Sequence, residues 1–260
     1  MDMGYLAGID LGTSSVKVLI MDPDGRTLAV SSRGYDVMTP KMSYAEQEPQ
    51  VWWDCTVMAI REAMEKSGIR PEELDGIGLS GQMHGLVAFD RNNEPVMPAI
   101  IWMDQRSAKE TALIKELAGD LLETELLNQP GAGMMICSLL WLKRHRPDVY
   151  DRIAHVMLPK DYIRYRLTGT IGSDFWDACA TLAFSVKGRC WCMELIRRAG
   201  LKEDIWPQVG ESSQAAGHVW AKAAARTGLS GHTRVVYGAG DSSAQLTGNG
   251  VIEEGIMACN

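Results

Sequence analysis

Residues 8–17 read GIDLGTSSVK, and this stretch decides the fold. The apolar runs 5–10 and 16–21 have the composition of two strands, and the small polar residues between them predict a tight hairpin. Such a hairpin lets backbone N–H groups approach phosphate oxygens closely. Asp10 ends its first strand, where a carboxylate can hold hydrated Mg²⁺. We therefore expect a phosphate-binding hairpin, although an ordinary hairpin in which Gly12 satisfies a turn explains the same residues.

The hairpin also carries side chains that suit a phosphate group. Thr13 and Ser14 add hydroxyl donors, and Lys17 either offsets phosphate charge or points outward from its strand. The sequence contains no G-x-x-x-x-G-K-[ST] pattern, which excludes a P-loop. Phosphate binding would therefore depend on the hairpin itself.

A second informative stretch, YGAGDSS at 237–243, lies near the other end of the sequence. We expect an apolar strand over 235–237 before it and a helix that starts at Asp241. Gly238 and Gly240 leave space around Asp241, which makes this carboxylate the best candidate for a general base. Aspartate is also an excellent N-cap residue, and the two roles are compatible.

The segment SGQMHG at 80–85 follows an expected strand over 74–79. Two glycines flank the triplet of Gln82, Met83 and His84, which suits a substrate loop at the carboxyl end of a strand. His84 offers two ring nitrogens to a polyol hydroxyl. A structural histidine and, at Met83, an ordinary core residue are the simpler interpretations.

The segment WMDQR at 102–106 ends another expected strand, over 98–102. A tryptophan beside a carboxylate commonly binds a sugar, because the ring supplies an apolar face and the carboxylate a hydrogen-bond acceptor. Trp102 and Asp104 fit that combination. A core tryptophan next to an N-cap aspartate explains the same residues.

The remaining pattern predicts an α/β domain. A turn signal at 22–25 and a third strand over 27–32 complete an antiparallel meander. Helices and strands then alternate, which indicates a mixed sheet with helices on both faces and a helical insertion at roughly 105–230. The other expected elements are helices over 50–67, 107–117, 137–145, 159–167, 191–199 and 221–227, and strands over 86–90 and 256–258.

Composition excludes several classes of function. The net charge of −7 argues against a nucleic-acid-binding surface, which needs a basic stripe. No apolar stretch reaches the roughly 20 residues of a membrane-spanning helix, and residues 1–4 lack the basic region of a signal peptide. The six cysteines show no paired C-x-x-C spacing, so we expect reduced thiols in a cytoplasmic protein rather than a zinc site.

Taken together, these segments resemble the FGGY family of carbohydrate kinases, and within it the kinases of D-xylulose. The resemblance extends over all 260 residues, with the segments in family order. SGQMHG is the most specific of them, because it points to the ketose kinases within the family. The segments that carry the resemblance are 8–17, 80–85, 99–106, 158–162 (LPKDY) and 238–241.

The resemblance implies an actin-like ATPase domain of the ribonuclease H-like type and transfer of a phosphoryl group from ATP to D-xylulose. Asp241 would be the general base on the terminal hydroxyl of the sugar, and Asp10 and Asp241 would hold Mg²⁺. The full-length enzyme would be a homodimer. The resemblance places Gln82, Met83, His84, Trp102, Asp104 and Ser242 against the sugar, and Gly12, Thr13, Ser14 and Lys17 against the nucleotide.

The sequence also departs from the family pattern. Ser242 stands where family members often have Asn or Gln, and residues 128–136 lack the Arg or Tyr that some relatives place on the substrate. Both differences leave the sugar open, and the sedoheptulose kinases, or another sugar kinase of the family, are the alternatives. A non-catalytic sugar-binding fragment and an actin-like ATP switch are alternatives of another class.

Length is the largest departure. These kinases have two actin-like domains, and residues 1–260 resemble the N-terminal one alone. The C-terminal nucleotide-binding domain is expected to be absent from this sequence. We therefore expect weak sugar binding and little or no turnover from these residues by themselves.

Overall fold

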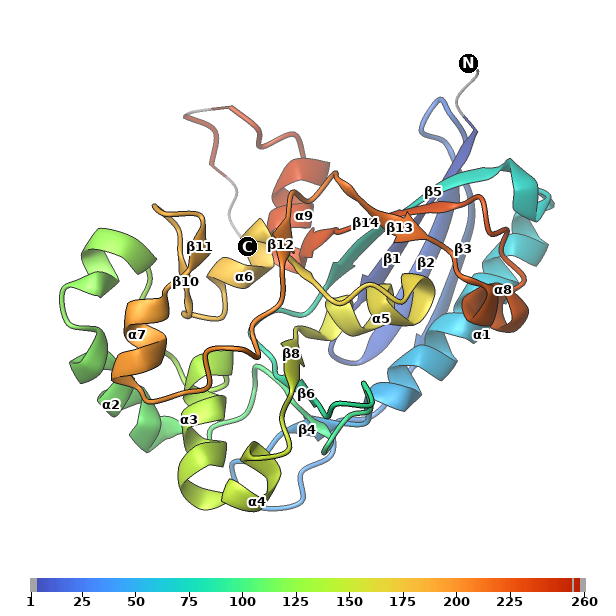
Figure 1. Cartoon of the computed structure of the whole chain (residues 1–260). Coiled ribbons are helices and arrows are strands. Elements are labelled where there is room, and N and C mark those ends of the chain that lie inside the picture. Colours follow the sequence, from blue (N-terminus) through green and yellow to red (C-terminus); the bar gives the residue numbers. More distant parts are fainter. Residues whose placement is uncertain (1–3, 254, 258–260) are drawn as a thin grey trace.

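The computed structural model describes residues 4–253 and 255–257, and its centre is a mixed sheet of seven strands (Figure 1). The strands are β1 (Tyr5–Leu11), β2 (Ser15–Met21), β3 (Thr27–Gly34), β5 (Leu74–Gly81), β13 (Ala215–His218), β14 (Arg234–Val236) and β15 (Ala239–Gly240). Their order is β13-β14-β5-β1-β2-β3, and β15 pairs with β5. The strands β1, β14 and β15 all run parallel to β5.

The predicted hairpin and meander are confirmed, since β1, β2 and β3 pair as antiparallel neighbours. A period of two decides which way each side chain faces. One face of this part of the sheet is fully covered, whereas Gly8 and Asp10 of β1 lie on the opposite, less covered face. The buried residues of β1 and β2 are Ala7, Ile9, Leu11, Val16, Val18 and Ile20.

Three helices cover the buried face of the sheet. They are α1 (Pro49–Ser67), α5 (Pro159–Thr168) and α8 (Ala221–Thr227), and all three agree with the predicted ranges within two residues. Trp52 and Trp53 of α1 are buried in the same apolar cluster as the sheet residues, and burial of two such rings contributes strongly to the stability of this layer. None of the helices in the described residues has the length and apolar character needed to cross a membrane.

A further helix, α9 (Asp241–Gly248), starts directly after β15 and contacts β15 and β5. Its Ala244 lines a cleft together with Gly8 and Leu19, so α9 lies on the face of the sheet opposite α1. Helices therefore occupy both faces, as predicted. The helix begins at Asp241 as expected, but Gly240 rather than Asp241 holds the N-cap position.

A second body of the molecule is built from helices around its own apolar cluster (Figure 1). Its helices are α2 (Ala108–Ala118), α3 (Met135–His145), α4 (Pro147–Tyr150) and α7 (Met193–Arg198), with a π-helical turn at Leu122–Leu126. The predicted insertion at 105–230 is therefore real, but its bounds are wrong. The helices α5 and α8 and the strand β13 fall inside that range and pack with the main sheet, because apolar residues such as Tyr162, Ile163 and Leu167 face it.

Several short elements differ from the prediction. The expected strand 98–102 shrinks to β7 (Ala99–Ile100), which pairs with β4 (Glu46–Gln47), and the helix expected at 191–199 starts only after β11 (Cys190–Trp191). The first two residues of the strand expected at 256–258 are not in a strand, and Ala258 lies outside the described residues. The remaining elements are β6 (Val87–Phe89), β8 (His155–Met157), β9 (Ser173–Asp174), α6 (Phe175–Cys179), β10 (Phe184–Ser185), β12 (Val209–Gly210) and a 3₁₀ turn at Pro71–Glu73.

Candidate functional site

Three parallel strands end side by side and bring the predicted site residues to one edge of the sheet. Asp10 of β1 is in register with Ser80 of β5, and Ser80 is in register with Ala239 of β15. The loop after β5 holds Met83 and the residues on either side of it, and Asp241 follows β15 directly. The carboxyl ends of parallel strands are where α/β proteins bind ligands.

A cleft of about 480 Å³ opens beside these strand ends, on the less covered face of the sheet. Asp10, Lys17 and Ser80 line it, together with Ala244 of α9. Asp10 and Lys17 are opposite each other in the register of β1 and β2. Mg²⁺ typically binds through one or two carboxylates plus substrate phosphates, so the half-buried Asp10 carboxylate at this cleft fits a magnesium–nucleotide complex. Within residues 4–253 and 255–257, no group of three or more His, Cys, Asp or Glu side chains is placed to hold a metal ion.

The hairpin between β1 and β2 is held by contacts at nearly every residue. Gly12 donates its N–H to the carbonyl of Ser15 at 3.0 Å. Thr13 accepts two hydrogen bonds, one at its carbonyl from Gln47 Nε2 (2.7 Å) and one at Oγ1 from Trp102 Nε1 (2.9 Å). Ser14 is exposed. The hairpin is thus rigid, with Ser14 open to a ligand.

The loop after β5 packs closely against the start of α5, and this close approach leaves no room for a side chain at either of its two glycines. A Cβ on Gly81 would lie 3.1 Å from Lys160 Cβ, and one on Gly85 would lie 3.0 Å from Pro159 Cγ. Between these anchors, Gln82 is buried, and its Nε2 donates to Gln47 Oε1 at 2.9 Å. Gln82 is therefore joined to the hairpin through Gln47, while its role toward a sugar stays a prediction.

His84 is fixed both by its backbone and by its ring. Its φ of 68° lies in the left-handed region that few residues other than glycine and asparagine adopt. Its Nδ1 lies 2.7 Å from the carbonyl oxygen of Ala180, which can only accept, so Nδ1 carries the proton of this bond. In the neutral ring Nε2 is then left as a hydrogen-bond acceptor. Backbone strain of this kind persists where the surroundings enforce it, often at functional sites.

Asp241 is the exposed first residue of α9, and a glycine turn places it. Gly238 has a φ of +82°, and a Cβ there would lie 2.3 Å from the carbonyl oxygen of Leu79. Gly240 packs against Met83, whose Cγ would lie 2.6 Å from an added Cβ. Ser242 donates its N–H to Asp241 Oδ1 at 2.6 Å. The strand β15, which ends directly before Asp241, therefore touches the loop that carries Met83.

Trp102 and Asp104 differ sharply in exposure. The Trp102 side chain is 46% exposed, whereas Asp104 is fully buried. Both oxygens of Asp104 accept hydrogen bonds from Arg106, and Oδ2 also accepts from the N–H of Ala45 at 2.7 Å. Trp102 thus presents a ring surface to solvent, while Asp104 is already engaged within the protein. A direct sugar contact by either residue stays a prediction.

Sequence reasoning missed several residues that hold this site together. Gln47 links the hairpin to Gln82, and Arg106 neutralises Asp104 and also pairs with Glu46 at 2.6 Å. Gln47 lies outside every motif, so no sequence signal could have identified it. Arg106 lies in the segment WMDQR, but nothing in its spacing indicates that it pairs with Asp104 and Glu46. Lys160 and Asp161 do lie in the LPKDY segment, so this charged pair could have been singled out in the sequence. In the structure both side chains are buried in α5.

Comparisons with known proteins agree with this geometry. Residues 5–248 match the family model described as the N-terminal domain of the FGGY family of carbohydrate kinases. The xylulose kinase of Bacillus subtilis is 34% identical over 258 residues, which are 99% of this chain and 52% of the relative. The xylulose kinase of Lactococcus lactis is 36% identical over 256 residues, 97% of this chain and 50% of the relative.

A solved structure is similar over the same extent. The crystal structure of a xyloylose kinase from Brucella ovis superposes with a TM-score of 0.90 at 36% identity, covering 96% of this chain and 51% of that one. The chain therefore spans about half the length of the curated relatives that it matches.

Proposed function

The chain belongs to the FGGY family of carbohydrate kinases, and we propose that it supplies the sugar site and the catalytic carboxylates for ATP-dependent phosphorylation of a ketose. The ketose is D-xylulose, and the products are D-xylulose 5-phosphate and ADP. The relatives named xylulose kinase, at 34% and 36% identity over nearly the whole chain, support this choice of sugar.

The observation that carries the proposal is the meeting of three strand ends. Asp10, the loop of Met83 and His84, and Asp241 come from β1, β5 and β15, which are neighbours in one sheet. Phosphoryl transfer depends on positioning and on stabilisation of charge rather than on covalent chemistry by the protein. Two carboxylates beside a polar loop on one rigid edge meet that need.

Asp241 is the general base of the proposed reaction. Its exposed carboxylate accepts the proton from the terminal hydroxyl of the sugar as that oxygen attacks the γ-phosphorus of ATP. The new O–P bond forms on the sugar, and the bond to the β-phosphate oxygen breaks to release ADP. Mg²⁺, when bound beside Asp10, supplies positive charge to the phosphate oxygens.

The sugar is recognised by the loop after β5 and by Trp102. His84 accepts a hydrogen bond from a sugar hydroxyl at Nε2, because Ala180 holds the proton on Nδ1. The half-exposed ring of Trp102 offers an apolar surface to the carbon side of the sugar. Met83 fills the space between this loop and Gly240.

The nucleotide phosphates face the hairpin, through the backbone of Gly12 and Thr13, the hydroxyl of Ser14 and the ammonium group of Lys17. Because the relatives are about twice as long as this chain, we propose that the other half of such a protein completes the nucleotide site and closes the cleft. The 260 residues alone then bind sugar and transfer phosphate slowly or not at all.

The test is calorimetric titration of the 260-residue chain with D-xylulose and with sedoheptulose. We expect D-xylulose to bind, and His84→Ala to weaken its binding at least tenfold, the order expected when a buried polar contact to substrate is lost. Asp241→Asn is expected to retain most of the affinity, because its amide still accepts a hydrogen bond, but to abolish transfer in a two-domain enzyme that contains it.

Other outcomes of the titration favour the alternatives. Tighter binding of sedoheptulose would change the sugar. Binding of ATP without any sugar would favour an actin-like ATP switch. Sugar binding with no transfer in the two-domain enzyme would indicate a non-catalytic sugar-binding protein.

A further inference from the structure

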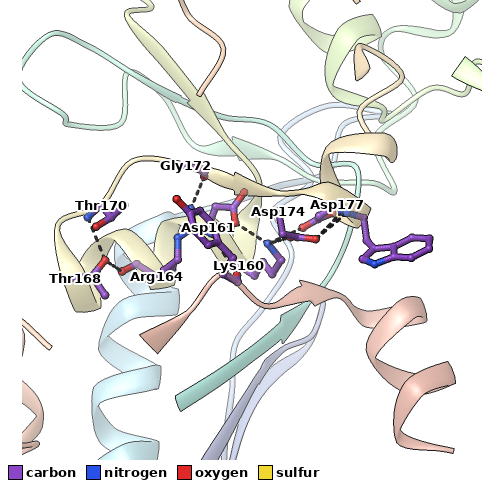
Figure 2. Close-up of polar contacts among 10 residues, drawn as sticks. Lys160, Asp161, Arg164, Thr168, Thr170, Gly172, Asp174 and Asp177 are labelled. Atoms are coloured by element: carbon purple, nitrogen blue, oxygen red, sulfur yellow. Dashed lines mark hydrogen bonds and ion pairs between the residues drawn. The ribbon is translucent and has the colours of Figure 1, made fainter. Parts of the chain in front are cut away.

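Five charged side chains are completely buried together next to the candidate site (Figure 2). Lys160 Nζ lies 2.6 Å from Asp161 Oδ1, 2.5 Å from Asp174 Oδ2 and 3.3 Å from Asp177 Oδ2. Arg164 pairs with Asp161 at 2.5 Å. We call these five residues the buried ion cluster: Lys160, Asp161, Arg164, Asp174 and Asp177.

The charges of the buried ion cluster balance only if one carboxyl group is protonated. Two cations face three carboxyl groups, and burial together with the neighbouring Asp174 raises the pKa of Asp177 well above its usual value, against the opposing effect of Lys160. Burial also raises the pKa of Asp161, but Arg164 and Lys160 outweigh it and lower that pKa. Removing ions from water is costly, and an apolar core of the same volume is often as stable. The cluster therefore calls for an explanation other than stability.

Lys160 packs against the loop after β5, which carries the proposed sugar contacts Met83 and His84. Its Cβ closes the space at Gly81, and Pro159 beside it closes the space at Gly85. The first turn of α5 is thus the platform for the loop that carries Met83 and His84. The ion pairs that hold the Lys160 ammonium group among three carboxyl groups therefore also hold the first turn of α5 in place.

Asp174 connects the cluster to the ring of His84. Its Oδ1 accepts from the N–H groups of Trp176 (2.9 Å) and Asp177 (3.1 Å), which caps α6, while its Oδ2 pairs with Lys160. Ala180 directly follows the last residue of α6, and its carbonyl holds Nδ1 of His84. The ion pair of Asp174 is therefore joined through α6 to the carbonyl that holds the His84 ring.

Arg164 connects the cluster to Asp241. Its NH1 group donates to the carbonyl of Tyr237 at 3.3 Å, and its guanidinium carbon lies 4.8 Å from the centre of the Tyr237 ring. Its NH2 group also donates to the carbonyl of Gly172. Tyr237 precedes the glycine turn that leads through β15 to Asp241, so Arg164 holds the base of that turn.

We propose that the buried ion cluster positions the two sides of the sugar site relative to each other. Lys160 and Asp174 are positioning residues for His84, and Arg164 is a positioning residue for Asp241. The part of this inference that concerns the sugar rests on the proposed function, whereas the placement of the His84 ring does not.

The first experiment compares Asp174→Asn with Glu110→Gln, two exchanges of a buried carboxylate for an amide. Asparagine keeps an oxygen that can cap α6 but loses the charge that attracts Lys160. Glu110 is equally buried but pairs with Arg144 and His145 in the second helical body, which has its own apolar cluster. The readouts are the imidazole ¹⁵N resonances of His84 and His145, assigned by substitution of each histidine, and the dissociation constant for D-xylulose.

The two variants have opposite expected results. Asp174→Asn shifts the His84 resonances and leaves those of His145 in place, and it weakens D-xylulose binding about tenfold, since a misplacement of about 1 Å already has large effects at a site. Glu110→Gln shifts only the His145 resonances and leaves the sugar affinity unchanged. A folded Asp174→Asn variant with the His84 resonances of the parent chain overturns the proposal.

A second variant, Arg164→Lys, tests the proposed link between Arg164 and Asp241. It can be used even if Asp174→Asn does not fold. Lysine keeps the charge but cannot reach Asp161, Tyr237 and Gly172 at once. We expect weaker binding of D-xylulose with little change in the His84 resonances. Unchanged sugar affinity in this variant overturns the role of Arg164. Absence of sugar binding in the parent chain defeats the proposed function, while the His84 resonances still decide the inference.

Discussion

The indole Nε1 of Trp102 donates a hydrogen bond of 2.9 Å to Oγ1 of Thr13, a residue 89 positions earlier in the chain. This bond joins the hairpin proposed to face the nucleotide to the ring proposed to face the sugar. A ligand that moves one of the two groups therefore acts on the other.

Loss of this bond should weaken the binding of D-xylulose. In Thr13→Val the shape is kept but the acceptor is removed, so the ligand must itself order the Trp102 ring. We expect a loss of binding free energy of at most about 1.5 kcal/mol, the upper end of the usual net value of one intramolecular hydrogen bond. Calorimetry on Thr13→Val, Trp102→Phe and the double variant gives the coupling between the two residues. Fully additive effects would show that the two side chains act independently.

The glycine turn before Asp241 should not tolerate a side chain. Gly238→Ala places a Cβ against the carbonyl oxygen of Leu79 at a φ of +82°, and we expect at least about 2 kcal/mol of destabilisation from strain and overpacking. The control is Gly228→Ala after α8, where φ is +79° but nothing lies within 4 Å of the added Cβ. That variant should lose only about 1 kcal/mol, the cost of the backbone conformation alone. Equal losses in urea unfolding would contradict the close contact at Gly238.

Gln82 should contribute to stability through Gln47. In Gln82→Leu the donor to Gln47 Oε1 is lost within the core, and we expect a decrease of about 1–3 kcal/mol in the free energy of unfolding. Gln47→Leu should cost at least as much, because Gln47 also bonds to the carbonyl of Thr13 and to Trp52. Chemical denaturation measures both, and sugar titration of the folded Gln82→Leu variant shows whether Gln82 also contacts the substrate.

Asp177→Asn should change how stability depends on pH. The pKa of Asp177 is raised in the folded state, so its protonated form stabilises the fold at low pH. This contribution is complete below the unfolded pKa of about 3.9 and is lost as the pH rises toward the folded pKa. We therefore expect Asp177→Asn to gain stability relative to the parent chain as the pH rises. Urea unfolding at pH 5 and pH 8 measures it, and a difference that is the same at both would refute a protonated Asp177.

The periodicity of apolar residues predicted the helices and strands that bury one face and leave the other more exposed. The alternation in β1 and β2 and the helical spacing in α1 were enough, because each buries one face against the other. Short strands escaped the prediction: residues 98–102 are apolar, yet only Ala99 and Ile100 find a partner, in β4. Which segment of the middle region joins the sheet is decided by tertiary packing, so the bounds of the helical insertion could not be read from the sequence.

For the candidate site, the sequence predicted which residues follow the strand ends, but not the contacts that support them. Asp10, His84 and Asp241 each follow an apolar run, and the parallel pairing of those strands brings them to one edge. Most supporting contacts were beyond reach, because Gln47 bonds to Thr13 and Gln82 and Arg106 bonds to Glu46 across 34 to 60 positions of the sequence. The burial of Asp104, which decides what its carboxylate contacts, likewise depends on Arg106 and Ala45.

The left-handed backbone of His84 limits how this loop can be altered. Glycine adopts such a φ freely, and asparagine, aspartate and histidine adopt it more often than the other residues do. A library that varies position 84 therefore starts from these four residues, whereas Met83, which packs against Gly240, has no left-handed backbone to satisfy. A change of sugar specificity through this loop, in the laboratory or in evolution, therefore has fewer suitable residues to choose from at position 84 than at position 83.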